Sequence, residues 1–412
     1  MSMSSHAGSR ESDDDPEVVP AAEAGRFRLL RMRPRDPQEA GRSATPLELF
    51  FDLVFVVAVS IAAVNLHDTF SEGRVLEGLL VYAVIFFGIW WAWINFTWFA
   101  TSFGTDDWLY RLLTFVQMAG VLVLAAGIGP AFEERDFSLL IFSYVVMRVA
   151  MVAQWLRASR GAGESRRATQ LYAIGISAVQ GLWLLSLLLP EPASYVAIGL
   201  LIAAELAVPV IAERQGETPW HPHHLTERFG LFTLILLGES LLASANAVIV
   251  ALEEVDELGP LLWIATLALV VTCALWWIYF WSPHHRLITD YASSVRHGYA
   301  HYFVFAAAGA LSAGIEVEID VLTEKSALDP LTASFIVTVP IAMFVMGIWW
   351  IALRHQQDRV VNAVVPVGAL LVLLDPLLPF PVAVSAIILT LVVVVLIVRA
   401  PEEAHEHGRM EG

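Results

Sequence analysis

The chain has 412 residues, of which 57% are hydrophobic, and its mean hydropathy is +0.64. The apolar residues gather in runs of roughly 17–25 residues, each long enough to cross the hydrocarbon core as a helix, and a soluble fold cannot use so many of them. The net charge of -17 argues against a nucleic-acid partner, and the single cysteine, Cys273, excludes an intramolecular disulfide framework.

Residues 1–45 precede the first apolar run and contain no apolar segment of the kind found in a cleavable signal peptide. This tail is acidic at ESDDDPEVVP and basic at RFRLLRMRPRDP. Its composition predicts a disordered cytoplasmic tail. The basic half, with apolar residues interleaved, could also lie on the anionic inner leaflet.

From residue 46 onward the sequence predicts an all-α, polytopic integral membrane protein with about twelve transmembrane helices. The predicted spans are 46–66, 75–100, 108–129, 138–156, 168–189, 193–212, 225–251, 259–281, 298–315, 331–353, 360–374 and 382–398. Asp375, Pro376, Pro379 and Pro381 separate the last two spans and are compatible with a tight outer turn or with a broken helix. The sequence therefore predicts twelve crossings, or eleven if that helix is broken.

Arginine predicts the orientation, because short loops that carry Arg or Lys stay on the cytoplasmic side. The N-tail and every second connection are basic, and these segments contain Arg10, Arg26, Arg28, Arg31, Arg33, Arg35, Arg42, Arg157, Arg160, Arg166, Arg167, Arg214, Arg286, Arg296, Arg354 and Arg359. The alternate connections hold only Arg74, Arg135 and Lys325 among several acids. We therefore expect a protein of the bacterial cytoplasmic membrane with both termini in the cytoplasm.

The two halves of the chain show a weak internal similarity. Glu48-Leu-Phe aligns with Glu227-Arg-Phe at an offset of 179, and Trp90-Trp91 aligns with Trp276-Trp277 at an offset of 186. Six spans are an even number, so both halves would enter the membrane in the same direction, as parallel repeats do in some transporters. The predicted organisation is a first six-helix half at 46–214, a second at 215–398 and a cytoplasmic C-tail at 399–412. Chance matching of apolar segments remains the alternative.

Charged residues inside the spans are the candidate functional residues, because each is costly in a membrane unless it is paired or hydrated. Glu48 and Asp52 lie four residues apart, on one helical face near the cytoplasmic end. Arg148, Glu205 and Glu239 lie near the middle of the fourth, sixth and seventh predicted spans.

Two interpretations of these charges remain open. In the first, Arg148 neutralises Glu205 or Glu239, and the carboxylates of Glu48 and Asp52 cap helix ends or bind Arg228, so the charges only fix helix packing. In the second, they line a cavity in which a desolvated carboxyl group picks up and releases protons. One arginine cannot neutralise every acid, which favours the second.

Other classes of site have little support in the sequence. His221, His223 and His224 precede the seventh span, while His284 and His285 follow the eighth, and the two groups could bind a transition metal from one face of the membrane. Neither has a cysteine partner or an HExxH pattern, so we predict no metal and no cofactor. Nucleotide-binding loops and hydrolase motifs are absent from the sequence, and we predict that the protein is not an enzyme and has no catalytic residues.

Two long segments carry a resemblance to a known family. TPLELFFDLVFVVAVS (45–60) and HHLTERFGLFTLILLGES (223–240) are similar to the two hallmark segments of the bacterial low-temperature-requirement A (LtrA) family. The resemblance covers about residues 40–398. It maps the family's hallmark residues onto Glu48, Phe51, Asp52, His224, Glu227, Arg228, Gly230, Gly238 and Glu239. It implies an integral membrane protein linked by name to growth in the cold, without an agreed substrate.

The leading hypothesis is a proton- or cation-coupled secondary transporter that works in the lipid bilayer on a small solute or on protons. Its candidate ion-site residues are Glu48, Asp52, Arg148, Glu205, Glu227, Arg228 and Glu239. The alternative is a membrane scaffold or membrane-adaptation factor that does not transport. A continuous hydrated cavity that reaches Glu239 would favour transport, and a closed, ion-paired core would favour the scaffold.

Overall fold

The computed structural model describes residues 29–39, 41–254, 259–355, 358–378 and 382–399, and all regular secondary structure in these ranges is helical. The helices are α1 (Pro46–Ser71), α2 (Val75–Phe103), α3 (Trp108–Ala126), α4 (Ile128–Glu133), α5 (Ser138–Ser159), α6 (Arg166–Ser186), α7 (Ala193–Glu213), α8 (Pro222–Glu254), α9 (Gly259–Phe280), α10 (Tyr291–Leu322), α11 (Pro330–Ile351), α12 (Arg359–Leu374) and α13 (Ala383–Val398). Short 3₁₀ turns, η1 (Gly163–Ser165), η2 (His284–Leu287), η3 (Leu353–His355) and η4 (Asp375–Leu377), lie between some of them.

The described residues form eleven helical segments that are long and apolar enough to cross a membrane, and α13 is a shorter apolar helix of 16 residues. The predicted all-helical, multi-pass architecture is therefore confirmed. A turn at Asp375 separates α12 from α13. The Asp375 carboxylate accepts hydrogen bonds from Val382 N and Ser385 N, both at 3.0 Å. These two donors belong to the start of α13, so Asp375 stabilises a tight turn between two distinct helices.

The ninth predicted span is too short at both ends. The sequence predicts it at 298–315, whereas α10 runs from Tyr291 to Leu322. Its first turn is fixed by Asp290, whose carboxylate accepts a hydrogen bond from Ser293 N at 2.7 Å in a capping box. Its last turns contain three acids, which hydropathy alone assigns to a loop. The helix therefore brings Glu316, Glu318 and Asp320 into the bundle.

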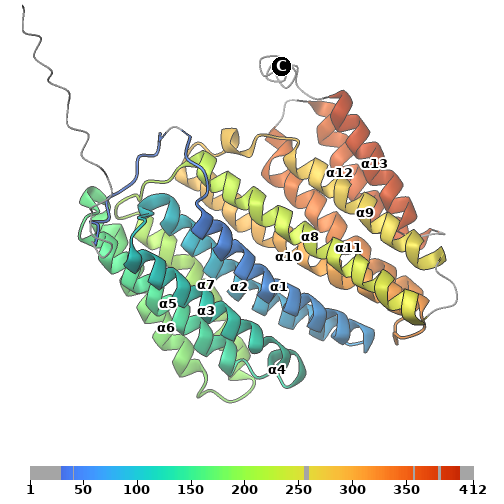
Figure 1. Ribbon diagram of the computed structural model, residues 1–412, viewed down its shortest axis with the longest axis horizontal. Helices are drawn as coiled ribbons and strands as arrows, with labels where there is room; N and C mark the ends of the chain where they lie inside the picture. The colour runs from blue at the N-terminus through green and yellow to red at the C-terminus, as the bar shows by residue number, and fades with distance from the viewer. Residues whose placement is uncertain (1–28, 40, 255–258, 356–357, 379–381, 400–412) are drawn as a thin grey trace, which may run out of the picture.

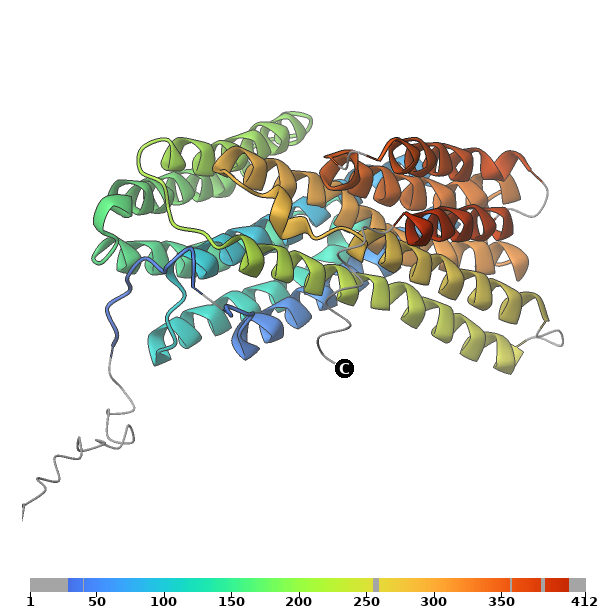
Figure 2. The same cartoon turned by 90° about the horizontal axis from the view of Figure 1, so that it is seen from above.

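The helices form an elongated bundle in which the first half of the chain lies beside the second (Figure 1 and Figure 2). Within the first half, α1 packs on α2 and α3, α3 on α5, α5 on α6, and α6 on α7. Within the second half, α8 packs on α9 and α10, α10 on α11, α11 on α12, and α12 on α13. The starts of α1 and α8 lie together, since Ala44 N donates to Glu227 at 3.1 Å. Further along both helices, Ser60 of α1 contacts Glu239 of α8, so the two helices run parallel. The duplication itself stays a prediction.

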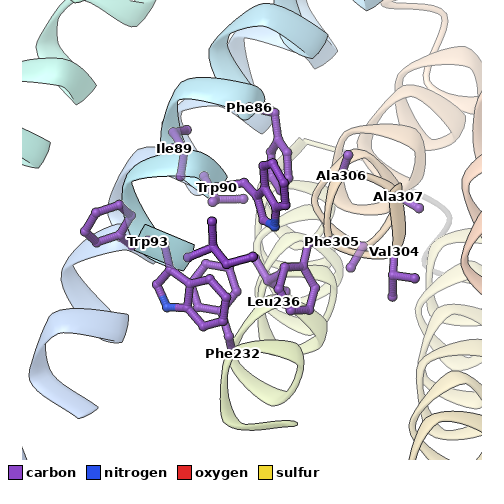
Figure 3. Packing of buried hydrophobic residues seen from close by; sticks show 14 of the residues in the cluster. Phe86, Ile89, Trp90, Trp93, Phe232, Leu236, Val304, Phe305, Ala306 and Ala307 are labelled. Atoms are coloured by element: carbon purple, nitrogen blue, oxygen red, sulfur yellow. The ribbon is translucent and has the colours of Figure 1, made fainter. Parts of the chain in front are cut away.

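The core where the halves meet is aromatic. Trp93 of α2 stacks on Phe232 of α8, with ring centroids 4.6 Å apart, and meets Phe305 of α10 edge-on at 5.6 Å. Figure 3 shows these rings between the three helices.

Part of the predicted disordered tail is packed against the helices. Leu30 N donates to Asp107 at 3.0 Å, Arg35 N donates to Ser102 O at 3.0 Å, and the Met32 side chain is buried. These contacts hold residues 29–39 along the ends of α2, α3 and α5. The disorder predicted for residues 1–45 therefore does not extend to residue 45, and residues 1–28 lie outside the described part of the chain.

Candidate functional site

The first turns of α1 and α8 bring together one group of predicted residues. Thr45 begins α1 with a capping box, in which Thr45 N and Thr45 Oγ1 donate to Glu48 Oε2 at 2.8 and 2.9 Å. The other oxygen, Glu48 Oε1, faces α8 and lies 3.1 Å from His224 Nε2 and 3.2 Å from Arg228 Nη1. Glu48 therefore both caps α1 and ties it to α8.

Arg228 is the centre of this group and is fully buried. Its Nη2 and Nε atoms donate to Asp52 at 2.5 and 3.2 Å, and Trp93 Nε1 donates to Asp52 at 2.7 Å. The two N–H groups of the guanidinium form a strong, charge-assisted pair with the carboxylate. The group contains two carboxylates, one guanidinium and the imidazole of His224, so its charge is balanced when His224 is protonated. It is suited to holding α1 against α8.

A pocket of about 460 Å³ opens beside this group, and its lining includes Glu48, Tyr110 and Arg111 but not Glu239. Near it, the two terminal nitrogens of Arg42 donate to Thr101 O and Ala100 O at 2.7 and 2.9 Å, at the C-terminal end of α2. Burial lowers the pKa of Arg42 to about 10, so the side chain is still charged at neutral pH. A cation is stabilised there by the helix dipole.

Glu239 lies further along the contact between α1 and α8. Ser60 Oγ of α1 donates to Glu239 Oε2 at 2.5 Å, and the Glu239 side chain is half-buried. Of the two predicted partners of Arg148, the structure pairs Glu205 with this arginine, and not Glu239. The hydroxyl of Ser60 is neutral and can donate only one hydrogen bond to the Glu239 carboxylate.

A second group of ionisable residues lies beyond Glu239, at the C-terminal ends of α1 and α10. His67 Nε2 is 2.7 Å from Asp320, and His67 Nδ1 is 3.1 Å from Asp68 and 3.7 Å from Glu316. Ser71 Oγ also donates to Asp320, at 3.1 Å. These residues were not among the predicted site residues. The sequence feature that could have indicated them is the acidic segment EVEID (316–320), whose low hydropathy placed it outside the ninth predicted span.

Arg148 and Glu205 form a separate buried pair between α5 and α7. Arg148 Nη2 is 3.6 Å from Glu205 Oε2 and donates to Tyr144 Oη at 2.6 Å. Glu205 also accepts hydrogen bonds from Trp91 Nε1 at 2.9 Å and from Gln180 Nε2 at 2.7 Å. Both charged residues are about 1% exposed, so the pair is almost completely buried.

The structure therefore distributes the seven predicted residues over three places. Glu48, Asp52, Arg228 and, by its bond to Ala44 N, Glu227 lie where α1 and α8 begin. Glu239 lies with Ser60 further along the same contact, and Arg148 lies with Glu205 in the first half. Sequence position gives the depth of a residue in a span but not the direction in which it faces, which explains why Arg148 and Glu239 appeared to share a site.

The family assignment rests on the extent of one match. The family model described as bacterial low temperature requirement A protein (LtrA) matches residues 43–398. The chain belongs to the LtrA family. Among curated proteins, the uncharacterized protein RA0937 of Rhizobium meliloti (strain 1021) is 30% identical over 248 residues. That match covers 58% of this chain and 58% of the relative, so the chain spans less than two thirds of that protein.

The two LtrA-like hallmark segments occupy equivalent places in the fold. Residues 45–60 form the start of α1 from its cap onward, and residues 223–240 form the corresponding part of α8. The Arg228–Asp52 pair and the Ser60–Glu239 hydrogen bond both join one segment to the other. In this LtrA protein, the hallmark segments are therefore the two sides of one helix–helix contact.

Proposed function

We propose that this LtrA protein is a secondary transporter coupled to protons or small cations, with its ion site along the contact of α1, α8 and α10. The observation that carries the proposal is the excess of acid around His67. Three carboxylates lie within 4 Å of this one imidazole, at the distances given above, and Glu316 and Asp320 are only 26% and 22% exposed. Asp68 is 62% exposed, and the charge of Lys325 also acts on Asp320. One protonated His67 and one lysine still do not balance three carboxylates. A partly buried excess of negative charge favours the uptake of protons or cations.

Ionisable and hydroxyl side chains recur along the same face of α1. Asp52, Ser60 and His67 are separated by eight and seven residues, which is close to two turns in each case and about 12 and 10 Å along the axis. Their partners are Arg228 and Glu239 on α8 and Asp320 on α10. This polar seam, defined by these six residues, passes from the beginning of α1 to its end. Ion-coupled transport needs such a series of binding groups across the membrane.

The seam is closed in the middle and at the Asp52 end. The pocket beside that end contacts Glu48 but none of the six seam residues, whereas at the other end His67 and Asp320 are 17% and 22% exposed. Between Asp52 and Ser60, α1 presents Phe55, Val56 and Val59, all at most 6% exposed. A transporter that alternates between two openings has such a barrier in each state. Ion passage would therefore require the two halves to move relative to each other.

We also propose the parallel 6+6 repeat, because it accounts for where Glu239 lies. Glu48 and Glu227 align at an offset of 179, and Ser60 and Glu239 are separated by the same offset. When two repeats are related by a twofold axis, a residue can contact its own equivalent only near that axis. The Ser60–Glu239 hydrogen bond joins two residues at this offset and so supports the proposed repeat. The order in which consecutive helices pack is similar in the two halves and supports the same proposal, although among the described residues the packing of α9 on α13 and of α1 on α10 has no comparable counterpart in α2–α7 and α3–α8.

The scaffold alternative is favoured by the closed core, since the lining of the pocket at Glu48 does not reach Glu239. The Arg228–Asp52 and Arg148–Glu205 pairs are closed to solvent, with each side chain at most 2% exposed. Buried pairs of this kind hold helices in register and move no ions.

Ion flux in proteoliposomes separates the two functions. Purified protein is reconstituted with a dye that responds to H⁺, Na⁺ or K⁺ inside the vesicles, and a gradient of the same ion is imposed. We expect at least one gradient to collapse faster than in protein-free vesicles, with saturation as the ion concentration rises. Equal rates with and without protein for all three gradients would contradict the transporter and leave the scaffold.

A further inference from the structure

Three buried histidines gather where α9 ends and α10 begins. His284 lies in η2, and His297 and His301 lie one turn apart on α10. Their exposed fractions are 8%, 4% and 0%. One ring nitrogen from each lies within 4.8 Å of the others. This three-histidine cluster is separate from the polar seam and has no part in the transport proposal.

In His301 and His284, a hydrogen bond to a backbone carbonyl determines which of the two ring nitrogens can bind a metal ion. His301 Nδ1 lies 2.7 Å from His297 O, and His284 Nε2 lies 2.9 Å from Tyr279 O. A carbonyl oxygen only accepts, so each of these nitrogens carries the proton. The other nitrogens, His301 Nε2 and His284 Nδ1, therefore carry lone pairs when the rings are neutral. A second hydrogen bond that orients the ring in this way is typical of histidines that bind metals.

Two nitrogens in the cluster lack a hydrogen-bond partner among the described residues. They are His284 Nδ1 and His297 Nε2, and both are buried. A buried polar atom without a partner costs about 1–3 kcal/mol, and native proteins contain few of them. Two such atoms in one cluster of three rings indicate that something absent from the protein chain itself satisfies them.

We propose that His284, His297 and His301 bind one divalent transition-metal ion of the class that includes Zn²⁺ and Co²⁺. Neutral imidazole suits these ions. A tetrahedral ion with Zn–N bonds of about 2.0–2.1 Å holds its ligands about 3.4 Å apart, so nitrogens that lie within 4.8 Å of one another need to approach by at most about 1.4 Å. The hydroxyl of Tyr279 lies 3.1 Å from His301 Nε2, and this hydrogen bond would be given up when the nitrogen binds the ion.

The ion would join two parts of the second half. Tyr279 ends α9, His284 belongs to the connection, and the two remaining ligands lie on α10. The i, i+4 spacing in HGYAH (297–301) is the sequence signal for two ligands on one helical face. In the sequence, His284 stands beside His285 and was grouped with His221, His223 and His224, whereas His297 and His301 were not predicted as ligands.

Metal binding to the purified full chain tests this proposal. The protein carries an affinity tag without histidine, is treated with a chelator in detergent, and is then titrated with Co²⁺. We expect about one Co²⁺ per chain, with the visible absorption of four-coordinate Co²⁺, and displacement by Zn²⁺. His297→Ala and His284→Ala should each weaken Co²⁺ binding at least about 100-fold, since even residues that only support a ligand change affinity 10- to 100-fold.

His223→Ala is the matched control, because His223 is an exposed histidine near the same end of the bundle and should leave Co²⁺ binding unchanged. A metal-dependent rise in the unfolding temperature of the wild type, lost in His284→Ala, is the second readout. His284 lies outside the membrane-spanning helices, so His284→Ala tests metal binding even if His297→Ala fails to fold. No stoichiometric binding by the wild type, or equal binding by wild type and His284→Ala, would overturn the proposal.

Discussion

Arg148→Leu should lower the free energy of unfolding by about 3–5 kcal/mol, the cost of leaving a buried charge without its partner. Glu205 lies 3.6 Å from Arg148 and is almost completely buried. Its remaining donors, Trp91 and Gln180, are neutral and cannot replace the guanidinium. Arg148→Lys should have a smaller effect, because it keeps the charge but loses the planar donor group. Thermal unfolding of the purified variants, followed by tryptophan fluorescence, measures the difference.

Two further variants make this test specific. Arg148→Leu combined with Glu205→Leu should recover much of the lost stability, because neither charge is then stranded. Arg167→Leu, at an exposed position where α6 begins, should leave the stability nearly unchanged. An Arg148→Leu variant as stable as the wild type would show that this arginine does not neutralise a buried acid.

Arg228→Leu should have an effect of similar size, about 3–5 kcal/mol, and should act on the contact between the halves. The change removes the partner of Asp52 at 2.5 Å and a neighbour of Glu48 at 3.2 Å. Glu48 keeps its capping bonds from Thr45, so Asp52 carries most of the cost. The measurement is again thermal unfolding, now with protease sensitivity of the connection between α7 and α8 as a report on how well the halves hold together.

Adding Asp52→Asn to the Arg228→Leu variant shows how much of the lost stability comes from the unpaired Asp52 charge and how much from lost packing of the Arg228 side chain. The double variant should be more stable than Arg228→Leu alone, since the stranded carboxylate has gone. Arg214→Leu, at an exposed arginine directly after α7, serves as the control. If Arg228→Leu and Arg214→Leu unfold at the same temperature, the Arg228 pair contributes nothing to the joining of α1 and α8.

The membrane helices were predictable from hydropathy because lipid requires long apolar segments and gives a strong signal. The charges on α1 were predictable for the related reason that Glu48 and Asp52 are conspicuous in such a segment. The pairing of Asp52 with Arg228 was one of the stated alternatives, and the structure shows it. The positions of the spans and of the charged residues within them can be predicted from one segment of sequence at a time.

What the sequence could not reveal depends on contacts between distant segments. Asp320 joins His67 across more than two hundred residues, and only the extra turns of α10 bring it there. Hydropathy ended that span at Ile315 because EVEID is polar. Likewise, His297 and His301 meet His284 only after the connection folds back on α10. Long-range pairing of polar residues leaves no trace in local periodicity.

Glu239→Gln is the most direct test of the transport account, measured as ion flux in proteoliposomes beside the stability of the same protein. Glutamine can still accept the hydrogen bond from Ser60 but cannot take up a proton or attract a cation. Glu217→Gln, at an exposed loop position, is the control for removing one charge. The account predicts that Glu239→Gln abolishes the flux and leaves the unfolding temperature unchanged or higher, while Glu217→Gln keeps both. Strong destabilisation with an unchanged flux would contradict it and make Glu239 a structural residue.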